Sequence, residues 1–169
     1  MTFHVGEKVV YPNQGVATIE SISQRSFGTQ PERFYLLRLA YSSMTVMVPF
    51  SHVQQVGLRP ITKNSEVTRM LEFLATGKPK YAADWKQRYK DNSEKMASGS
   101  LLEIAEVFKS LVIIQTDKPL SFREKKMLER SRQMLLAEVC ASRTLQEAQA
   151  VELMNRALLK SSLTFPEPM

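Results

Sequence analysis

The chain has 169 residues and carries 23 Lys and Arg against 17 Asp and Glu, a formal net charge of +6 at pH 7. This excess favours an anionic partner but does not separate nucleic acid from a membrane surface or an acidic protein. The one cysteine, Cys140, excludes an intramolecular disulfide and a cysteine-rich zinc site. The N-terminus does not resemble a secretion signal, and no apolar stretch reaches the roughly 18 residues that span a bilayer. We therefore expect a cytoplasmic protein with no membrane partner.

Up to about residue 60, apolar and polar side chains alternate between turn signals, which is typical of short antiparallel strands. Strands are predicted at KVVYP, GVATIESISQRS, ERFYLLRLA and MTVMVPF, with a short fifth at QQVGL. Gly15, the turn around Gly28 and the loop 41–43 mark hairpin ends. We expect a small antiparallel barrel or strongly bent sheet. Its predicted core consists of Val9, Val16, Ile19, Ile22, Tyr35, Leu37, Leu39, Val46 and Val48.

From about residue 65 to about residue 161, the apolar period is helical. Helix starts are indicated by a short polar residue followed three positions later by Glu or Gln, the signature of a capping box. Four pairs fit this signature: Asp84 with Gln87, Ser100 with Glu103, Ser121 with Glu124, and Thr144 with Glu147. A further helix over Ser65 to Thr76 ends at Gly77, so the pattern predicts five helices.

The change of period predicts an α+β protein of two domains. Residues 1–62 form the β domain and residues 65–161 an all-α domain of five helices, with a junction at 59–64 short enough for the domains to pack or to share a hinge. The prolines of the last residues forbid further helix, so we expect 162–169 to be a disordered tail.

The residue types that catalysis and metal binding require are not grouped in the sequence. His4 and His52 have no nearby cysteine and no helical ligand spacing, so we expect them in surface or core roles. The glycines form no phosphate-binding loop. Ser100 and Ser121 are explained by capping rather than by nucleophilic catalysis. No enzyme activity, metal or cofactor is predicted.

Positive charge is concentrated on the second and fourth predicted helices. Residues 78–95 hold six basic and three acidic side chains, and residues 118–132 hold six and two. Trp85, the only tryptophan, lies in the first turn of the second helix. An exposed aromatic ring among cations can stack on an unpaired base or wedge between base steps while the cations neutralise phosphates. Two alternatives stay open: the indole packs on the helical core, and the cations only solvate helix faces.

Five motifs occur in order along the chain: VGEKVVYPNQGVATIESI, MTVMVP followed by VGLRPI, DWKQRYKDNSEKMASGS, EIAEVFKSL and LSFREKKMLERSRQMLLAE. Together they resemble the CarD family of bacterial transcription regulators, also known as CdnL proteins, from about Phe3 to about Leu159. The resemblance implies a Tudor-like, SH3-like β domain that binds the RNA polymerase β subunit. It also implies a helical domain that contacts promoter DNA beside the transcription bubble. Trp85 matches a family tryptophan that wedges into the minor groove at the upstream edge of the bubble and stabilises the open complex.

The resemblance also implies individual contact residues. Family DNA contacts match Arg88, Lys90 and Lys125, and the full expected DNA-binding set is Trp85, Lys86, Arg88, Lys90, Arg123 and Lys125. Polymerase contacts match Arg25 and Met47. Some members carry arginine at the position of Met47, so the methionine offers an apolar contact in its place. Arg25 has the alternative of a solvated charge at a strand end.

We expect a monomer that acts as a transcription regulator. Two other functions stay open at this point. A non-specific DNA-binding protein would use the basic helices alone and would bind any duplex with steep salt dependence. A protein–protein adaptor would use the β domain and the helices to join two proteins, but it gives the basic helices no role.

Overall fold

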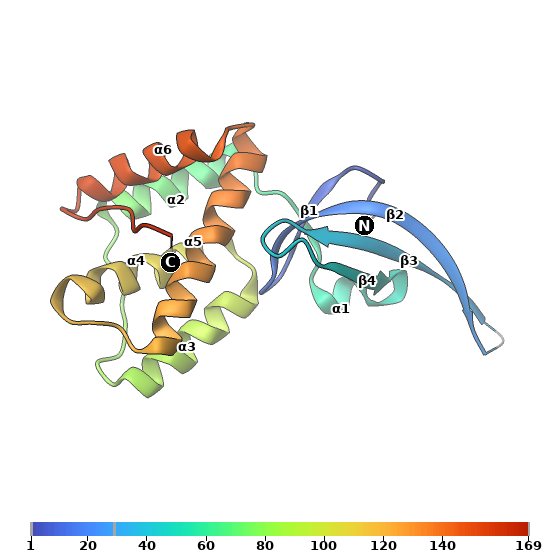
Figure 1. Cartoon of the computed structure of the whole chain (residues 1–169), viewed down its shortest axis with the longest axis horizontal. Coiled ribbons are helices and arrows are strands. Elements are labelled where there is room, and N and C mark those ends of the chain that lie inside the picture. The colour runs from blue at the N-terminus through green and yellow to red at the C-terminus, as the bar shows by residue number, and fades with distance from the viewer. Residues whose placement is uncertain (1, 29, 169) are drawn as a thin grey trace.

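The computed structural model describes residues 2–28 and 30–168 and shows a β domain followed by a helical domain (Figure 1). This confirms the predicted α+β class. Within the described residues, no helix combines the length and the apolar character that a bilayer crossing needs.

Five antiparallel strands form one sheet in the order β4-β3-β2-β1-β5. Their bounds are β1 Lys8–Tyr11, β2 Gly15–Phe27, β3 Gln30–Leu39, β4 Thr45–Pro49 and β5 Arg59–Pro60. The sheet bends strongly, and β2 and β3 continue past the other strands as a curved hairpin directed away from the helical domain (Figure 1). The strands β4 and β5 are therefore its two edges.

The strand predicted at QQVGL is wrong. The segment after β4 forms a 3₁₀ turn, η1 Phe50–His52, and a single helical turn, α1 Val53–Val56. In it Val53 and Leu58 are buried while the glutamines between them are exposed. Gly57 ends the turn in a left-handed conformation with φ 85°, which glycine adopts without strain.

One face of the sheet carries the core of the β domain. Tyr35 lies at its centre: the Tyr35 hydroxyl accepts a hydrogen bond from the Phe3 amide at 3.0 Å, and its ring stacks on Phe50 with centroids 4.2 Å apart. Of the predicted core residues, Val46 is half-buried and Ile22 is exposed. Ile22 pairs with Tyr35 across the ladder, just past the irregularity of β2 between Ile19 and Ser21, but is 41% exposed. The remaining predicted core residues are buried.

The helical domain contains the five predicted helices. They are α2 Asn64–Thr76, α3 Trp85–Ser98, α4 Leu101–Asp117, α5 Phe122–Arg143 and α6 Glu147–Leu159. The helix α4 packs against α2, α3 and α5, and most of its side chains are buried. Lys109 of α4 is also buried: its Nζ donates to the carbonyl of Phe73, in the last turn of α2, at 3.1 Å and to the carbonyl of Gly77, the residue after α2, at 2.6 Å. Burial lowers the pKa of Lys109.

Three of the four predicted caps are confirmed. The side chains of Asp84, Ser100 and Ser121 each accept a hydrogen bond from the amide three residues on. Thr144 is not a cap of α6. It ends α5 in a left-handed conformation with φ 54°, and α6 begins three residues later, at Glu147. The Gln146 amide donates to the Gln149 side chain at 2.9 Å, so the glutamine pair satisfies this helix start instead.

The expected disordered tail, 162–169, is corrected for residues up to Pro166, which pack on the bundle (Figure 1), with the Pro166 carbonyl accepting from Arg132 Nε at 3.0 Å. Residue 169 lies outside the described residues. Leu163 is part of the buried helical core. The ring of Phe165 packs against Phe108 with centroids 5.5 Å apart, and its amide donates to Asn155 Oδ1 at 2.9 Å. The prolines do end the helix, but the apolar residues between them continue the packing.

The two domains are joined by a buried polar cluster around Glu138 of α5. The Glu138 carboxylate is 3% exposed. It accepts hydrogen bonds from both terminal nitrogens of Arg59, in β5, at 2.8 and 2.9 Å. It also accepts the amide of Thr62 at 2.9 Å. Arg59 further donates to the Gly99 carbonyl at 2.7 and 3.0 Å. The predicted junction thus packs onto the helical domain through hydrogen bonds with defined directions.

Apolar residues extend this interface along the outer face of the sheet, which is the face opposite the core. Val10 and Val16 are paired across β1 and β2 and are buried, although their neighbours Val9 and Ala17 are the residues that enter the core. Outward-facing residues of β2 and the Cys140 region of α5 line one groove. The helix α5 therefore covers one end of the outer face.

We predict that Arg59→Ala lowers the free energy of unfolding by about 3–5 kcal/mol, because it leaves the Glu138 carboxylate buried without its cation. Urea denaturation of the full chain measures the loss. The control is Arg38→Ala, which breaks an exposed pair with Glu20 and should cost about 1 kcal/mol or less. Equal losses for the two variants would contradict a special role for the Arg59–Glu138 pair.

Candidate nucleic-acid interface

Trp85 is the first residue of α3 and is 46% exposed. The helix starts there because Asp84 caps it, with the Asp84 carboxylate accepting the Gln87 amide at 3.2 Å. The buried stripe of α3 consists of residues that come later in the helix, ending at Met96. The indole is therefore not part of the helical core and projects from the helix start. The alternative that the indole packs on the helical core is therefore not observed.

Arg88 does not lie on the surface, and this corrects its expected role as a DNA contact. Its side chain is 6% exposed and forms a two-point ion pair with Glu124 of α5, with Nε–Oε2 at 2.7 Å and Nη2–Oε1 at 2.9 Å. The hydrogen bonds with Glu124 raise the pKa of Arg88 above its usual value. A guanidinium that is buried and paired in this way is not presented to a phosphate at the surface.

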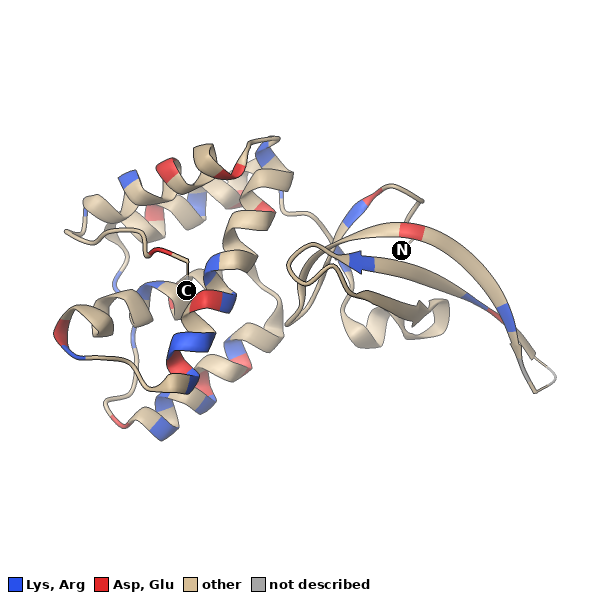
Figure 2. Cartoon of the chain, in the orientation of Figure 1, with Lys and Arg blue, Asp and Glu red and all other residues tan. Residues whose placement is uncertain are grey.

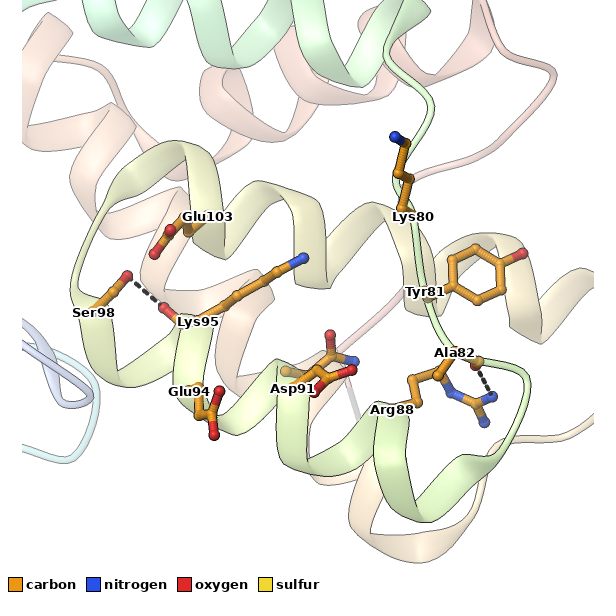
Figure 3. Close-up of a pocket in the computed structure, with 10 residues that line it drawn as sticks. Lys80, Tyr81, Ala82, Arg88, Asp91, Glu94, Lys95, Ser98 and Glu103 are labelled. Atoms are coloured by element: carbon orange, nitrogen blue, oxygen red, sulfur yellow. Dashed lines mark hydrogen bonds between the residues drawn. The ribbon is translucent and has the colours of Figure 1, made fainter.

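The ion pair instead holds two helix starts together. Arg88 Nη1 donates to the carbonyls of Ala82 and Ala83, both at 3.2 Å, which fixes the segment that leads into Trp85. Figure 3 shows the guanidinium turned back toward this segment. Glu124 lies in the first turn of α5, where its amide is capped by Ser121. The starts of α3 and α5 therefore lie next to each other, around a recess of about 390 Å³ that Trp85 and Ser121 line.

The other expected DNA contacts occupy different positions on α3 and α5. Lys86 and Lys90 are exposed, and Lys86 Nζ lies 5.9 Å from the Trp85 ring centroid. Arg123 is exposed, with its guanidinium carbon 5.6 Å from the Tyr89 ring centroid. Lys125 is half-buried and faces another side of α5, because it lies two positions from Arg123. Blue segments mark this concentration of Lys and Arg on α3 and α5 in Figure 2.

Two further cations belong to this surface and were missed as site residues. Lys126 and Arg130 line a groove of about 300 Å³ between α3 and α5, together with Arg123 and the apolar side chains of Tyr89 and Met96. The signal was present in the sequence, because positions 123, 126 and 130 are three and four residues apart and share one helix face. The charge count showed the cluster but not its face.

The other side of α3 carries mixed charge. A pocket of about 430 Å³ there is lined by Lys80 and Lys95 but also by Asp91, Glu94 and Glu103 (Figure 3). Lys95 also pairs with Glu106 at 3.0 Å. By contrast, within residues 2–28 and 30–168 neither Lys86, Lys90 nor Arg123 has a carboxylate within 4 Å. The side that α3 shares with α5 is therefore the anion-attracting one.

The expected polymerase contacts, Arg25 and Met47, lie on one face of the sheet. Met47 pairs with Leu36 and Arg25 pairs with Glu32, and positions 32 and 36 of β3 point to the same side. Arg25 is exposed near the end of the hairpin, and Met47 is 38% exposed on the edge strand β4. This is the outer face that α5 covers at its other end. Its Arg25–Met47 end is left open.

Residues suited to metal binding are not brought together. The exposed side chains of His4 and His52 belong to different segments of the β domain, and His4 lies 3.5 Å from Glu7. Among the described residues, no three His, Cys, Asp or Glu side chains are placed so that they could hold a metal ion. Cys140 is half-buried against the helical core, and burial raises the pKa of its thiol.

Comparisons with known proteins match both halves of the chain. Residues 3–62 match the family model of the CarD-like/TRCF RID domain, and residues 69–155 match that of the CarD C-terminal domain. The chain is 33% identical over 147 residues to YdeB of Bacillus subtilis strain 168, named as a candidate transcription factor, covering 87% of this chain and 96% of YdeB.

Two solved structures from Myxococcus xanthus are similar to part of the chain. CdnLNt is 39% identical and covers 36% of this chain and 86% of its own, with a TM-score of 0.32. The solution NMR structure of the 72-residue N-terminal domain of CarD is 36% identical and covers 35% of this chain and 79% of its own, with a TM-score of 0.31.

The geometry predicts that Arg88→Met loosens the indole although residue 88 itself is buried. Loss of the guanidinium frees the segment before α3 and leaves Glu124 unpaired, at a cost of about 3–5 kcal/mol. Because Trp85 is the only tryptophan, its fluorescence anisotropy reports the change directly and should fall. The control is Lys90→Met, an exposed cation on the same helix, which should leave both anisotropy and stability unchanged. Unchanged anisotropy in Arg88→Met would remove the positioning role.

Proposed function

The chain belongs to the CarD/CdnL family of transcription factors, which interact with RNA polymerase, and from this membership we propose that it stabilises open promoter complexes. In this proposal the β domain binds the polymerase β subunit, and the helical domain contacts promoter DNA at the upstream edge of the bubble. Trp85 enters the minor groove there as a wedge. The chain acts in the cytoplasm, as a monomer and without a cofactor.

The observation that carries the proposal is the position of Trp85. A half-exposed indole stands at a helix start that a buried ion pair holds, next to cations that have no carboxylate partner in the described part of the chain. Stacking on an aromatic ring is worth about 1–3 kcal/mol per base, which is too little to melt a duplex and enough to stabilise one already opened. Lys86, Lys90 and Arg123 would neutralise the phosphates beside the opened step.

The polymerase contact is proposed at the open end of the outer sheet face. Arg25 supplies a charge near the hairpin end, and Met47 supplies an adaptable apolar contact on an edge strand. An unpaired strand edge can also add its backbone hydrogen bonds to a partner sheet. Because this end of the sheet is directed away from the helices, both domains can be engaged at once (Figure 1).

Binding to polymerase makes the DNA contact effectively intramolecular, so the helical domain needs little sequence preference of its own. A wedge that contacts separated strands and not closed duplex shifts the equilibrium by its differential affinity for the two states. About 1.4 kcal/mol of difference gives a tenfold shift toward the open complex. The buried Arg59–Glu138 pair supports this coupling, because it fixes the domain with the wedge to the domain with the polymerase contact.

We predict that Trp85→Ala leaves polymerase binding intact but lowers the yield of heparin-resistant open complexes about tenfold. The matched control is Tyr81→Ala. Tyr81 is an exposed aromatic residue beside the mixed-charge pocket of α3, where no DNA contact is proposed. The proposal predicts wild-type yields for this control. Equal yields from the Trp85 variant and the wild type would refute the wedge.

We predict that Arg25→Glu weakens association with the polymerase β lobe, measured by pull-down with the purified lobe, while the helical domain stays folded. Reversal of one contact charge in an interface affects association more than its loss alone. Arg33→Glu is the control, because residue 33 is also exposed on the hairpin but alternates to the opposite sheet face. Identical binding by the two variants would exclude Arg25 from the contact.

A further inference from the structure

Phe122 is an exposed aromatic residue that the proposed function leaves unused. It is 71% exposed, the highest value among the large apolar side chains whose burial the structure describes. Burial of a phenylalanine ring is worth about 1.5–3 kcal/mol, which this ring largely forgoes in the free protein. Leu120, two residues earlier, is buried and already ties this segment to the core. The exposed ring is therefore free to contact a partner molecule.

The setting of Phe122 repeats that of Trp85. Each is the first residue of its helix, preceded by a capping residue and followed by a cation: Asp84, Trp85 and Lys86 in α3, and Ser121, Phe122 and Arg123 in α5. The Arg88–Glu124 pair fixes these two helix starts against each other, around the recess lined by Trp85 and Ser121. Two exposed rings are thus presented at the first positions of two adjoining helix starts.

The charges around Phe122 decide which partner the ring fits. Lys126 Nζ lies 4.6 Å from the ring centroid, and Lys118 and Arg123 flank it in the sequence. None of these three cations has a carboxylate within 4 Å among residues 2–28 and 30–168. The carboxylate of Glu124 is neutralised by Arg88, and Asp84 caps α3. The acids that remain nearby in sequence are Asp117, which is exposed, and Glu129, two turns further along α5, which is half-buried and accepts a hydrogen bond from Gln133. The partner is therefore anionic and offers a flat or apolar surface.

We propose that Phe122 makes a second aromatic contact with promoter DNA, on the nucleotide next to the one that Trp85 contacts. The inference rests on the proposed function and deepens it. One face of the ring carries the Lys126 ammonium, which meets the phosphate, and the rest of the ring packs on the sugar or the unpaired base. Two rings on adjoining helix starts hold the separated strand at two points, which resists reclosure more than a single wedge does.

The test measures the lifetime of open complexes formed by polymerase holoenzyme with the full-length protein and its Phe122→Ala variant. The expected result is a lifetime shortened by at least about fivefold, since loss of one stacking contact weakens binding by at least that factor. Phe122→Trp retains a ring and should restore the lifetime to that of the wild type. Because the side chain is exposed, both variants should melt at the wild-type temperature and pull down polymerase equally.

Trp85→Ala, assayed in parallel, separates failure of the Phe122 contact from failure of the Trp85 wedge. If Trp85→Ala shortens the lifetime and Phe122→Ala does not, the second contact is refuted while the wedge stands. If neither variant shortens it, the proposed function itself fails. If Phe122→Ala instead abolishes the pull-down of polymerase, the ring contacts protein, and the DNA contact is equally refuted. A shortened lifetime with intact polymerase binding, restored by Phe122→Trp, is the result that supports the inference.

Discussion

The buried ion pair between Arg88 and Glu124 is the interaction on which the candidate interface depends. Neither residue touches the surface, yet together they bring the start of α3 against the start of α5. Through Arg88 the pair also anchors the carbonyls that precede Trp85. An isolated first-turn residue would fray with its helix end. The indole here has a defined direction because the segment before it and the helix beside it are both fixed by one guanidinium.

The helix α5 carries a second buried pair of the same kind. Glu124 lies in its first turn and joins α3, while Glu138 lies further along and joins the β domain through Arg59. Fourteen residues at 1.5 Å each separate the two carboxylates by about 21 Å along the helix. The helix therefore works as a rigid spacer between the domain proposed to bind polymerase and the side chains proposed to contact DNA. The length of α5 and the positions of Glu124 and Glu138 therefore determine where Trp85 lies relative to the β domain.

Much of this fold could be predicted from the sequence because its signals are local. Alternation located β1 to β4, and three caps located the starts of α3, α4 and α5, since each depends on residues within four positions. The failures are tertiary. Arg88 has the sequence context of a surface cation, and only its pairing with a residue 36 positions away buries it. Thr144 fits the pattern of an N-cap, but in the structure it is the C-cap of α5, and Gln146 is the N-cap of α6. Phe165 packs on Phe108, but the prolines beside it in the sequence indicate only that the helix has ended and do not predict this contact.

The two buried pairs also explain why a regulator of this size would use charge in its interior. Replacement of a buried ion pair by apolar residues often stabilises a protein, so stability alone does not favour Arg88–Glu124 or Arg59–Glu138. An apolar contact, however, tolerates sliding and rotation, whereas two parallel hydrogen bonds between guanidinium and carboxylate fix both distance and angle. The proposed wedge, worth about 1.4 kcal/mol, would lose its effect if it were averaged over many orientations, because each misdirected orientation would contact open and closed DNA alike. By fixing the orientation of the indole, the two directional Arg–Glu pairs would let a contact of small free energy distinguish open from closed DNA.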